Sequence, residues 1–185
     1  MLIRTEIPVD AAGIDALLRS AFGRDNEADL LHALLRSAFG RDNEADLLHA
    51  LREDGLLTLG VVATDDEGQV VGYAGFTPVD VEGEDCQWVG LAPLAVAEAY
   101  RGQGIAKQMV YEGLDSLNEF GYGAVVVLGD PEVYGKWGFK PAAEFDLHCK
   151  WPDTAPYFLI YPLENDAADR YHGLVNFSHH FDSCE

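Results

Sequence analysis

The sequence predicts one mixed α/β domain built on a largely antiparallel sheet. Strand-like stretches alternate along the 185 residues with stretches whose apolar residues recur at helical spacing. Hydrophobic residues make up 48% of the chain and charged residues 24%, a balance typical of a globular protein that buries one core. We therefore expect a single domain over residues 1–185, with residues 165–185 as a polar C-terminal tail.

The N-terminal half is expected to form a strand, two helices and a hairpin, at residues 1–7, 10–22, 43–53 and 56–79. Asp10 can cap the first helix, because its carboxylate can accept hydrogen bonds from the free amides at the helix start. The hairpin is predicted from two apolar runs around an Asp-Glu-Gly turn at residues 66–68.

The C-terminal half is expected to form a long strand, a helix, a buried strand, a short helix or turn and two more strands, at residues 86–96, 105–121, 123–129, 130–139, 144–151 and 157–163. Pro93 lies inside the long strand and cannot donate a ladder hydrogen bond, so we expect a bulge or a splayed neighbour there. The buried strand is apolar on both faces, as a central strand should be.

Residues 16–32 and 33–49 are identical and directly adjacent. Two identical units are too few for a stacked repeat and indicate a recent or engineered duplication. Their junction creates a stretch from Glu27 to Phe39 without glycine or proline, whose apolar residues fall at helical spacing, so we expect an extra amphipathic helix. An apolar stripe with no place in the parent core predicts a homodimer that packs or exchanges this helix.

The formal net charge of −20 limits the choice of partners. It argues against nucleic-acid backbones and anionic membranes and favours cationic partners, although scattered acidic residues also serve solubility. The N-terminus has no secretory signal and no apolar run is long enough to span a membrane, so we expect a cytoplasmic protein. The cysteines and histidines lack the spacing of a disulfide framework or metal site, and the histidines of the C-terminal region are expected in a solvated tail. The cysteines are Cys86, Cys149 and Cys184, and these histidines are His148, His172, His179 and His180.

The most informative segment is "RGQGIA", which begins at Arg101 between a predicted strand and a predicted helix. Gly102, Gly104 and Ala106 are small enough for a ligand to approach the backbone, and a helix start leaves amides unpaired beside a positive dipole end. Such a turn binds phosphate or pyrophosphate, and Lys107 adds a second local cation. The segment is neither a Walker loop nor a complete dinucleotide fingerprint, and an ordinary turn is the alternative.

This turn, preceded by a strand ending "LAV" and followed by "YGKWGF", resembles the GNAT N-acetyltransferase superfamily. The longer stretch of residues 89–142 is similar to its YhbS-like bacterial branch, and the resemblance covers residues 2–163 apart from the duplicated copy. It implies a GNAT fold: a central mixed, mostly antiparallel sheet of about seven strands flanked by helices. It also implies acetyl-CoA-dependent transfer of an acetyl group, without a metal, to a primary amine of a small molecule or protein.

The resemblance also implies roles for individual residues. Backbone groups at the end of the long strand would bind the pantetheine arm, and amides of the glycine turn would hold the pyrophosphate. Tyr134 matches a tyrosine that protonates the departing thiolate, with a core aromatic as the alternative. The implied cofactor-binding residues are Leu94, Ala95, Val96, Arg101, Gly102, Gln103, Gly104, Ile105, Ala106 and Lys107.

Direct transfer requires the amine to lose a proton before it attacks. Some relatives keep a glutamate on the central strand for this step, but the strand from Cys86 to Val96 carries no carboxylate. Asp130, at the end of the next strand, is our first candidate for the general base. Capping of the short helix after Pro131 is an equal alternative for this residue, and a water relay would need no single base. The absent strand carboxylate also leaves a second function open, a catalytically silent acyl-CoA-binding or sensing module.

Overall fold

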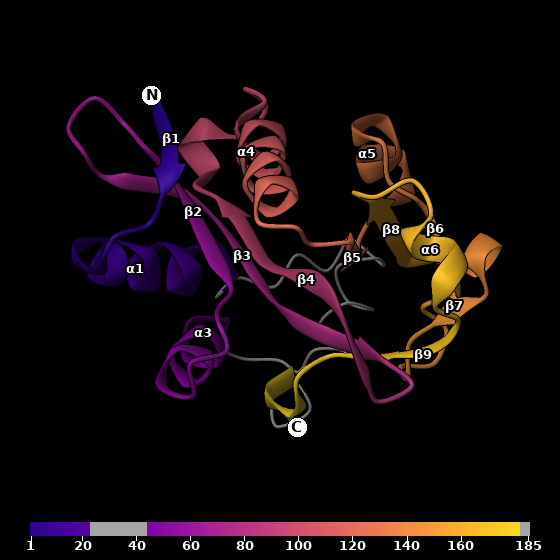
Figure 1. The fold of residues 1–185 in the computed structure, drawn as a ribbon. Coiled ribbons are helices and arrows are strands. Elements are labelled where there is room, and N and C mark those ends of the chain that lie inside the picture. Colours follow the sequence, from indigo (N-terminus) through magenta and orange to yellow (C-terminus); the bar gives the residue numbers. More distant parts are fainter. Residues whose placement is uncertain (23–43, 182–185) are drawn as a thin grey trace.

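The computed structural model describes residues 1–22 and 44–181, which form a sheet flanked by helices (Figure 1). The helices are α1 (Ala11–Phe22), α3 (Glu44–Glu53), α4 (Ile105–Glu119), α5 (Pro131–Tyr134) and α6 (Ala167–Arg170). The strands are β1 (Leu2–Thr5), β2 (Leu59–Thr64), β3 (Val70–Val81), β4 (Glu84–Val96), β5 (Ala124–Leu128), β6 (Lys140–Pro141), β7 (Leu147–His148), β8 (Phe158–Pro162) and β9 (Gly173–Asn176). Within these ranges, no helix combines the length and apolar character that crossing a membrane requires.

The sheet runs in the order β1-β2-β3-β4-β5-β8-β6, and β9 joins it by pairing with the far end of β3. Neighbouring strands are antiparallel except for the pairs β4–β5 and β7–β9. The predicted mixed, mostly antiparallel sheet with flanking helices is therefore confirmed. Sequence reasoning missed β6, which is only two residues long, and β9, which lies in the expected tail.

Helices cover both faces of the sheet. Side chains alternate along β3, so that Ala74 and Phe76 pack under α4 whereas Tyr73 packs among residues of α1 and α3. Figure 1 shows α4 on one side of the strands and α1 and α3 on the other. A methyl group at Gly113 of α4 would overlap the Phe76 ring, so glycine allows this helix to lie close against the sheet.

The centre of the sheet opens between β4 and β5. These parallel strands pair over a short stretch that ends at Gly90 and Val126, and the rest of β5 pairs with β8 alone. On its other side β4 contains a bulge, because the register to β3 shifts between the pairs Phe76–Leu91 and Ala74–Leu94. The bulge and the splayed neighbour expected at Pro93 are both present.

Two expectations for the C-terminal part were wrong. Residues 144–151 do not form one strand, because Asp146 adopts a left-handed conformation (φ 59°) that ends a 3-10 turn and leaves only β7 beyond it. Residues 166–181 are not a solvated tail, since they form α6 and β9 and bury Phe181, which is 1% exposed. The extra helix expected from Glu27 to Phe39 lies outside the described residues.

Candidate cofactor and acyl-transfer site

The glycine turn presents bare backbone. Gly102 and Gly104 have φ values of 79° and 78°, a left-handed conformation that strains residues with a side chain. A Cβ atom at either position would meet nothing within 4 Å. Both glycines are therefore required by the backbone path of the turn and not by packing, and the surface above them is open.

The amides of this turn are free to bind an anion. In the described part of the chain, no amide from Gly102 to Lys107 donates a hydrogen bond, and Gly104 gives the start of α4 no side-chain cap. Ile105 is 4% exposed and fixes the first turn of α4 to the core. The Arg101 amide is used differently, because it donates to the carbonyl of Glu98 at 3.3 Å. The free amides and the positive end of the α4 dipole suit a phosphate or pyrophosphate.

Arg101 and Lys107, the two predicted cations of the turn, are both exposed. Arg101 Nε donates to the carbonyl oxygen of Val96 at 3.0 Å and thereby fixes the turn to the end of β4. Lys107 Nζ lies 5.5 Å from the centre of the Tyr111 ring. Positive charge is thus present beside the turn in an otherwise acidic protein.

The register of β4 decides which backbone groups face the opening. The Ala97 amide donates to the Val71 carbonyl on β3 at 2.8 Å, and the polar groups of successive residues in a strand point to alternate sides. Leu94 and Val96 therefore direct their backbone groups away from β3, towards the gap that β5 leaves. Those of Ala95 are directed to Tyr73, its partner on β3.

Tyr134 ends α5, on the far side of this opening. Its ring makes edge contacts with Trp137 and Phe139, with centroid separations of 4.9 and 5.4 Å, and would overlap any side chain at Gly129. Its hydroxyl forms no hydrogen bond with another described residue. Burial raises the pKa of Tyr134 above its ordinary value, which keeps the hydroxyl neutral and makes it a weaker acid than an exposed tyrosine.

Asp130 lies between β5 and α5 and caps the helix. Its Oδ1 accepts a hydrogen bond from the Glu132 amide at 2.9 Å. The capping alternative is therefore realised for one oxygen, and a role for the other oxygen as a base stays a prediction. The described residues contain no group of histidine, cysteine, aspartate and glutamate side chains that could hold a metal ion.

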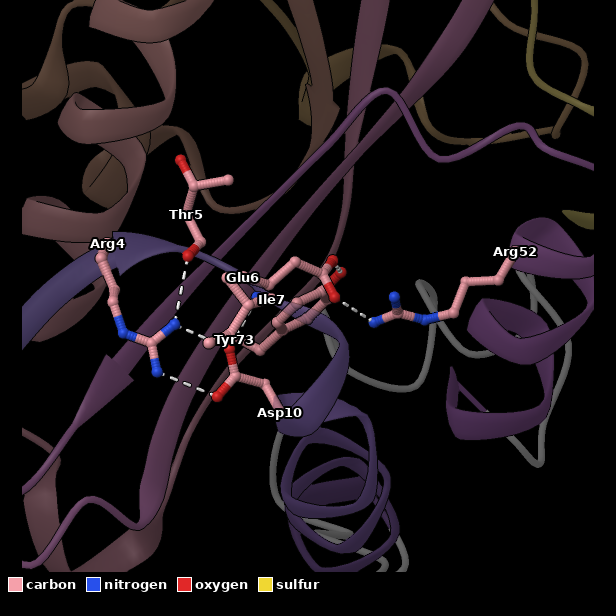
Figure 2. Close-up of polar contacts among 7 residues, drawn as sticks. All are labelled: Arg4, Thr5, Glu6, Ile7, Asp10, Arg52 and Tyr73. Carbon is pink, nitrogen blue, oxygen red and sulfur yellow. Dashed lines mark hydrogen bonds and ion pairs between the residues drawn. The ribbon is translucent and has the colours of Figure 1, made fainter.

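The opposite face of the sheet holds a polar network that sequence reasoning missed (Figure 2). Glu6 accepts a hydrogen bond from the Tyr73 hydroxyl at 2.7 Å and forms an ion pair with Arg52 of α3 at 2.6 Å. Nearby, Arg4 binds both oxygens of Asp10 at 2.7 and 2.9 Å. No local spacing links Glu6, Arg52 and Tyr73, because the sheet brings them together from three separate segments.

A family model described as Acetyltransferase (GNAT) family matches residues 27–139. The chain belongs to the GNAT acetyltransferase family. This GNAT protein is 59% identical to the uncharacterized N-acetyltransferase YhbS of Escherichia coli strain K12, over 98% of each chain. The resemblance to the YhbS-like branch is confirmed, and the protein is an N-acetyltransferase.

Two solved structures give the same result. The GNAT family N-acetyltransferase YhbS from Escherichia coli, in complex with CoA, is 58% identical with a TM-score of 0.87, covering 100% of this chain and 93% of that one. A GNAT family acetyltransferase from Brucella melitensis, in complex with acetyl-CoA, is 32% identical with a TM-score of 0.74, covering 98% and 97%. The GNAT fold predicted from the sequence is thus confirmed.

Proposed function

We propose that this GNAT protein transfers the acetyl group of acetyl-CoA directly to a primary amine of a small molecule or protein. The observation that carries the proposal is the opening between β4 and β5, with the free amides of the glycine turn on the β4 side and Tyr134 of α5, whose hydroxyl bonds to no other described residue, on the β5 side. Each of these elements would supply one requirement of acetyl transfer: a site for the phosphates, an unpaired strand edge for the arm that carries the thioester, and a proton donor.

The residues present fit acetyl-CoA. The amides from Gly102 to Lys107 would bind the pyrophosphate, since nothing in the described structure occupies them or covers the glycines. The backbone groups of Leu94 and the amide of Val96 would bind the pantetheine arm as an added strand would, in the place where β5 has diverged, while the Val96 carbonyl accepts from Arg101. Two relatives that cover nearly the whole chain were solved with CoA or acetyl-CoA, which supports this assignment.

Side chains of this protein would then transfer two protons, one from the amine and one to the departing sulfur. Acetyl-CoA supplies the acetyl group as a thioester; the amine nitrogen bonds to its carbonyl carbon while the carbon–sulfur bond breaks. Asp130, or water beside it, takes the proton that the amine loses. Tyr134 donates its hydroxyl proton to the departing sulfur. The net charge of −20 favours approach of a cationic amine.

Thiol release from acetyl-CoA, measured over a panel of polyamines and amino acids, tests the proposal. We expect at least one amine to accelerate release well above the rate without acceptor. Tight CoA binding without amine-dependent thiol release from any acceptor would contradict the proposed transfer to an amine.

A further inference from the structure

Glu6 is a carboxylate buried under the helical layer that α1 and α3 form. Its side chain is 10% exposed, and Tyr73, its hydrogen-bond donor, is completely buried. Burying a carboxylate costs free energy, which the Tyr73 hydrogen bond and the ion pair with Arg52, whose side chain is 29% exposed, must offset. The Glu6–Tyr73–Arg52 network therefore needs a reason other than stability alone.

Glycines shape the floor on which this network lies. Glu6 follows β1, and in the next two strands the neighbouring positions are Gly60 and Gly75, which pair with each other. A Cβ atom at Gly60 would overlap the Glu6 carboxylate and lie 2.7 Å from the Tyr73 hydroxyl. The carboxylate thus lies flat across β2, and Gly60 provides the space for it.

Gly75, the second of these glycines, lies next to the β4 bulge. A Cβ atom at Gly75 would lie 3.2 Å from the Tyr73 ring, from the Ala92 carbonyl oxygen and from Pro93 Cδ. The ring and the bulge therefore face each other across Gly75. Tyr73 is also the ladder partner of Ala95, so its position affects β4 just beyond the bulge as well.

We infer that Glu6, Tyr73 and Arg52 act as a brace, a set of positioning residues that hold the β4 bulge in its cofactor-binding shape. Arg52 and Glu6 fix the Tyr73 ring from the edge of the sheet. The ring supports Ala92 and Pro93, and the bulge directs Leu94 and Val96 into the opening. The brace rests on the proposed function, because it acts on the strand that would bind acetyl-CoA.

Calorimetric titration of the full-length protein with CoA tests the brace. Gly60→Ala changes β2, which lies two strands away from the bulge, and displaces the Glu6 and Tyr73 side chains. Glu6→Ala removes the carboxylate. We expect both to weaken CoA binding about tenfold or more, on the scale of one lost buried hydrogen bond. Glu6→Gln still offers an oxygen to the Tyr73 hydroxyl, so it should recover most of the affinity that Glu6→Ala loses.

Asp10→Asn is the matched control. It weakens the other charged contact in Figure 2, which joins β1 to the 3-10 turn before α1 without touching Tyr73, and should leave CoA affinity within about twofold of the parent. Gly75→Ala perturbs the bulge directly and must also weaken binding. A merely structural network would lower the stability of the Glu6 variants and leave their CoA affinity unchanged.

The outcomes separate the two ideas. If the parent binds CoA and the folded Gly60→Ala, Glu6→Ala and Gly75→Ala variants bind it equally well, the brace is wrong and the proposed function stands. If Gly60→Ala and Glu6→Ala fail to fold, Gly75→Ala and Tyr73→Phe decide alone, and unchanged affinity in both overturns the brace. A parent protein that does not bind CoA overturns the brace together with the proposed cofactor.

Discussion

Replacing Gly104 with valine should abolish cofactor binding while leaving the protein folded. Gly104 has φ 78° and its Cβ direction is open, so the substitution creates backbone strain without a clash inside the protein. The strain of a non-glycine residue in this conformation costs about 1–3 kcal/mol, which a domain of this size can tolerate. The added side chain, however, would project into the space that a pyrophosphate needs.

The expected loss of affinity follows from the amides involved. If two amide–phosphate hydrogen bonds are lost, each contributing about 1.5–3 kcal/mol, CoA should bind more than about a hundredfold more weakly. Gly83→Val is the matched control, because Gly83 has φ 84° and equally open space but lies at the β3–β4 hairpin, at the other end of β4. Thermal unfolding should show that Gly104→Val and Gly83→Val lose similar amounts of stability. Calorimetry should show a loss of CoA binding for Gly104→Val alone. Unchanged CoA affinity in folded Gly104→Val would refute the assignment of the turn.

Other variants test the remaining assignments. Tyr134→Phe should lower turnover by about 10²-fold in the thiol-release assay and preserve CoA affinity, because it removes only the proton donor; turnover within a few-fold of the parent would return Tyr134 to a packing role. Asp130→Asn keeps a side chain that can cap α5, so normal turnover in this variant would exclude Asp130 as the base, whereas Asp130→Ala should also cost about 1 kcal/mol of stability. The Arg4 guanidinium lowers the pKa of Asp10, so this carboxylate stabilises the fold above its unfolded pKa of about 3.9 and loses that contribution as the pH falls through its lower folded pKa. Asp10→Asn should therefore flatten the pH dependence of unfolding below about pH 4, measured by thermal melts. Deletion of residues 33–49 should leave CoA binding intact and convert a dimer into a monomer in light scattering at matched concentration; monomers in both forms would contradict the dimer expected from the duplication.

The geometry of the glycine turn could be predicted because it depends on backbone and on neighbouring residues. Gly102 and Gly104 mark a turn before a helix, and the free amides follow from the geometry of any helix start. Pro93 marked the bulge for a similar reason, since proline removes one ladder donor. The residues alone could not show that the backbone groups of Ala95 face β3 whereas those of Leu94 and Val96 face the opening, because this depends on the register of β4 with β3.

The brace and the C-terminal segment could not be predicted, because contacts between distant segments create them. His180 shows why: its ring contacts Asp54 at 2.6 Å and Ser178 at 2.6 Å, and the residue is 8% exposed. Read along the chain, it was one of several histidines in a polar tail. In the structure, β9 pairs with the end of β3, and residues 179–181 after it lie against α3.

The free amides would also allow so acidic a protein to bind the proposed anionic cofactor. Long-range repulsion from a net charge of −20 is screened over about 8 Å at physiological ionic strength, whereas a hydrogen bond acts at about 3 Å. Arg101 donates from Nε to Val96, which leaves the other guanidinium nitrogens near the turn and fixes the turn to the strand. At the pyrophosphate, the attraction of the local amides and of this cation can therefore exceed the long-range repulsion. The acidic surface, in turn, attracts a cationic amine that approaches from bulk solvent. A cationic amine and an anionic cofactor are in this way compatible with one strongly acidic chain.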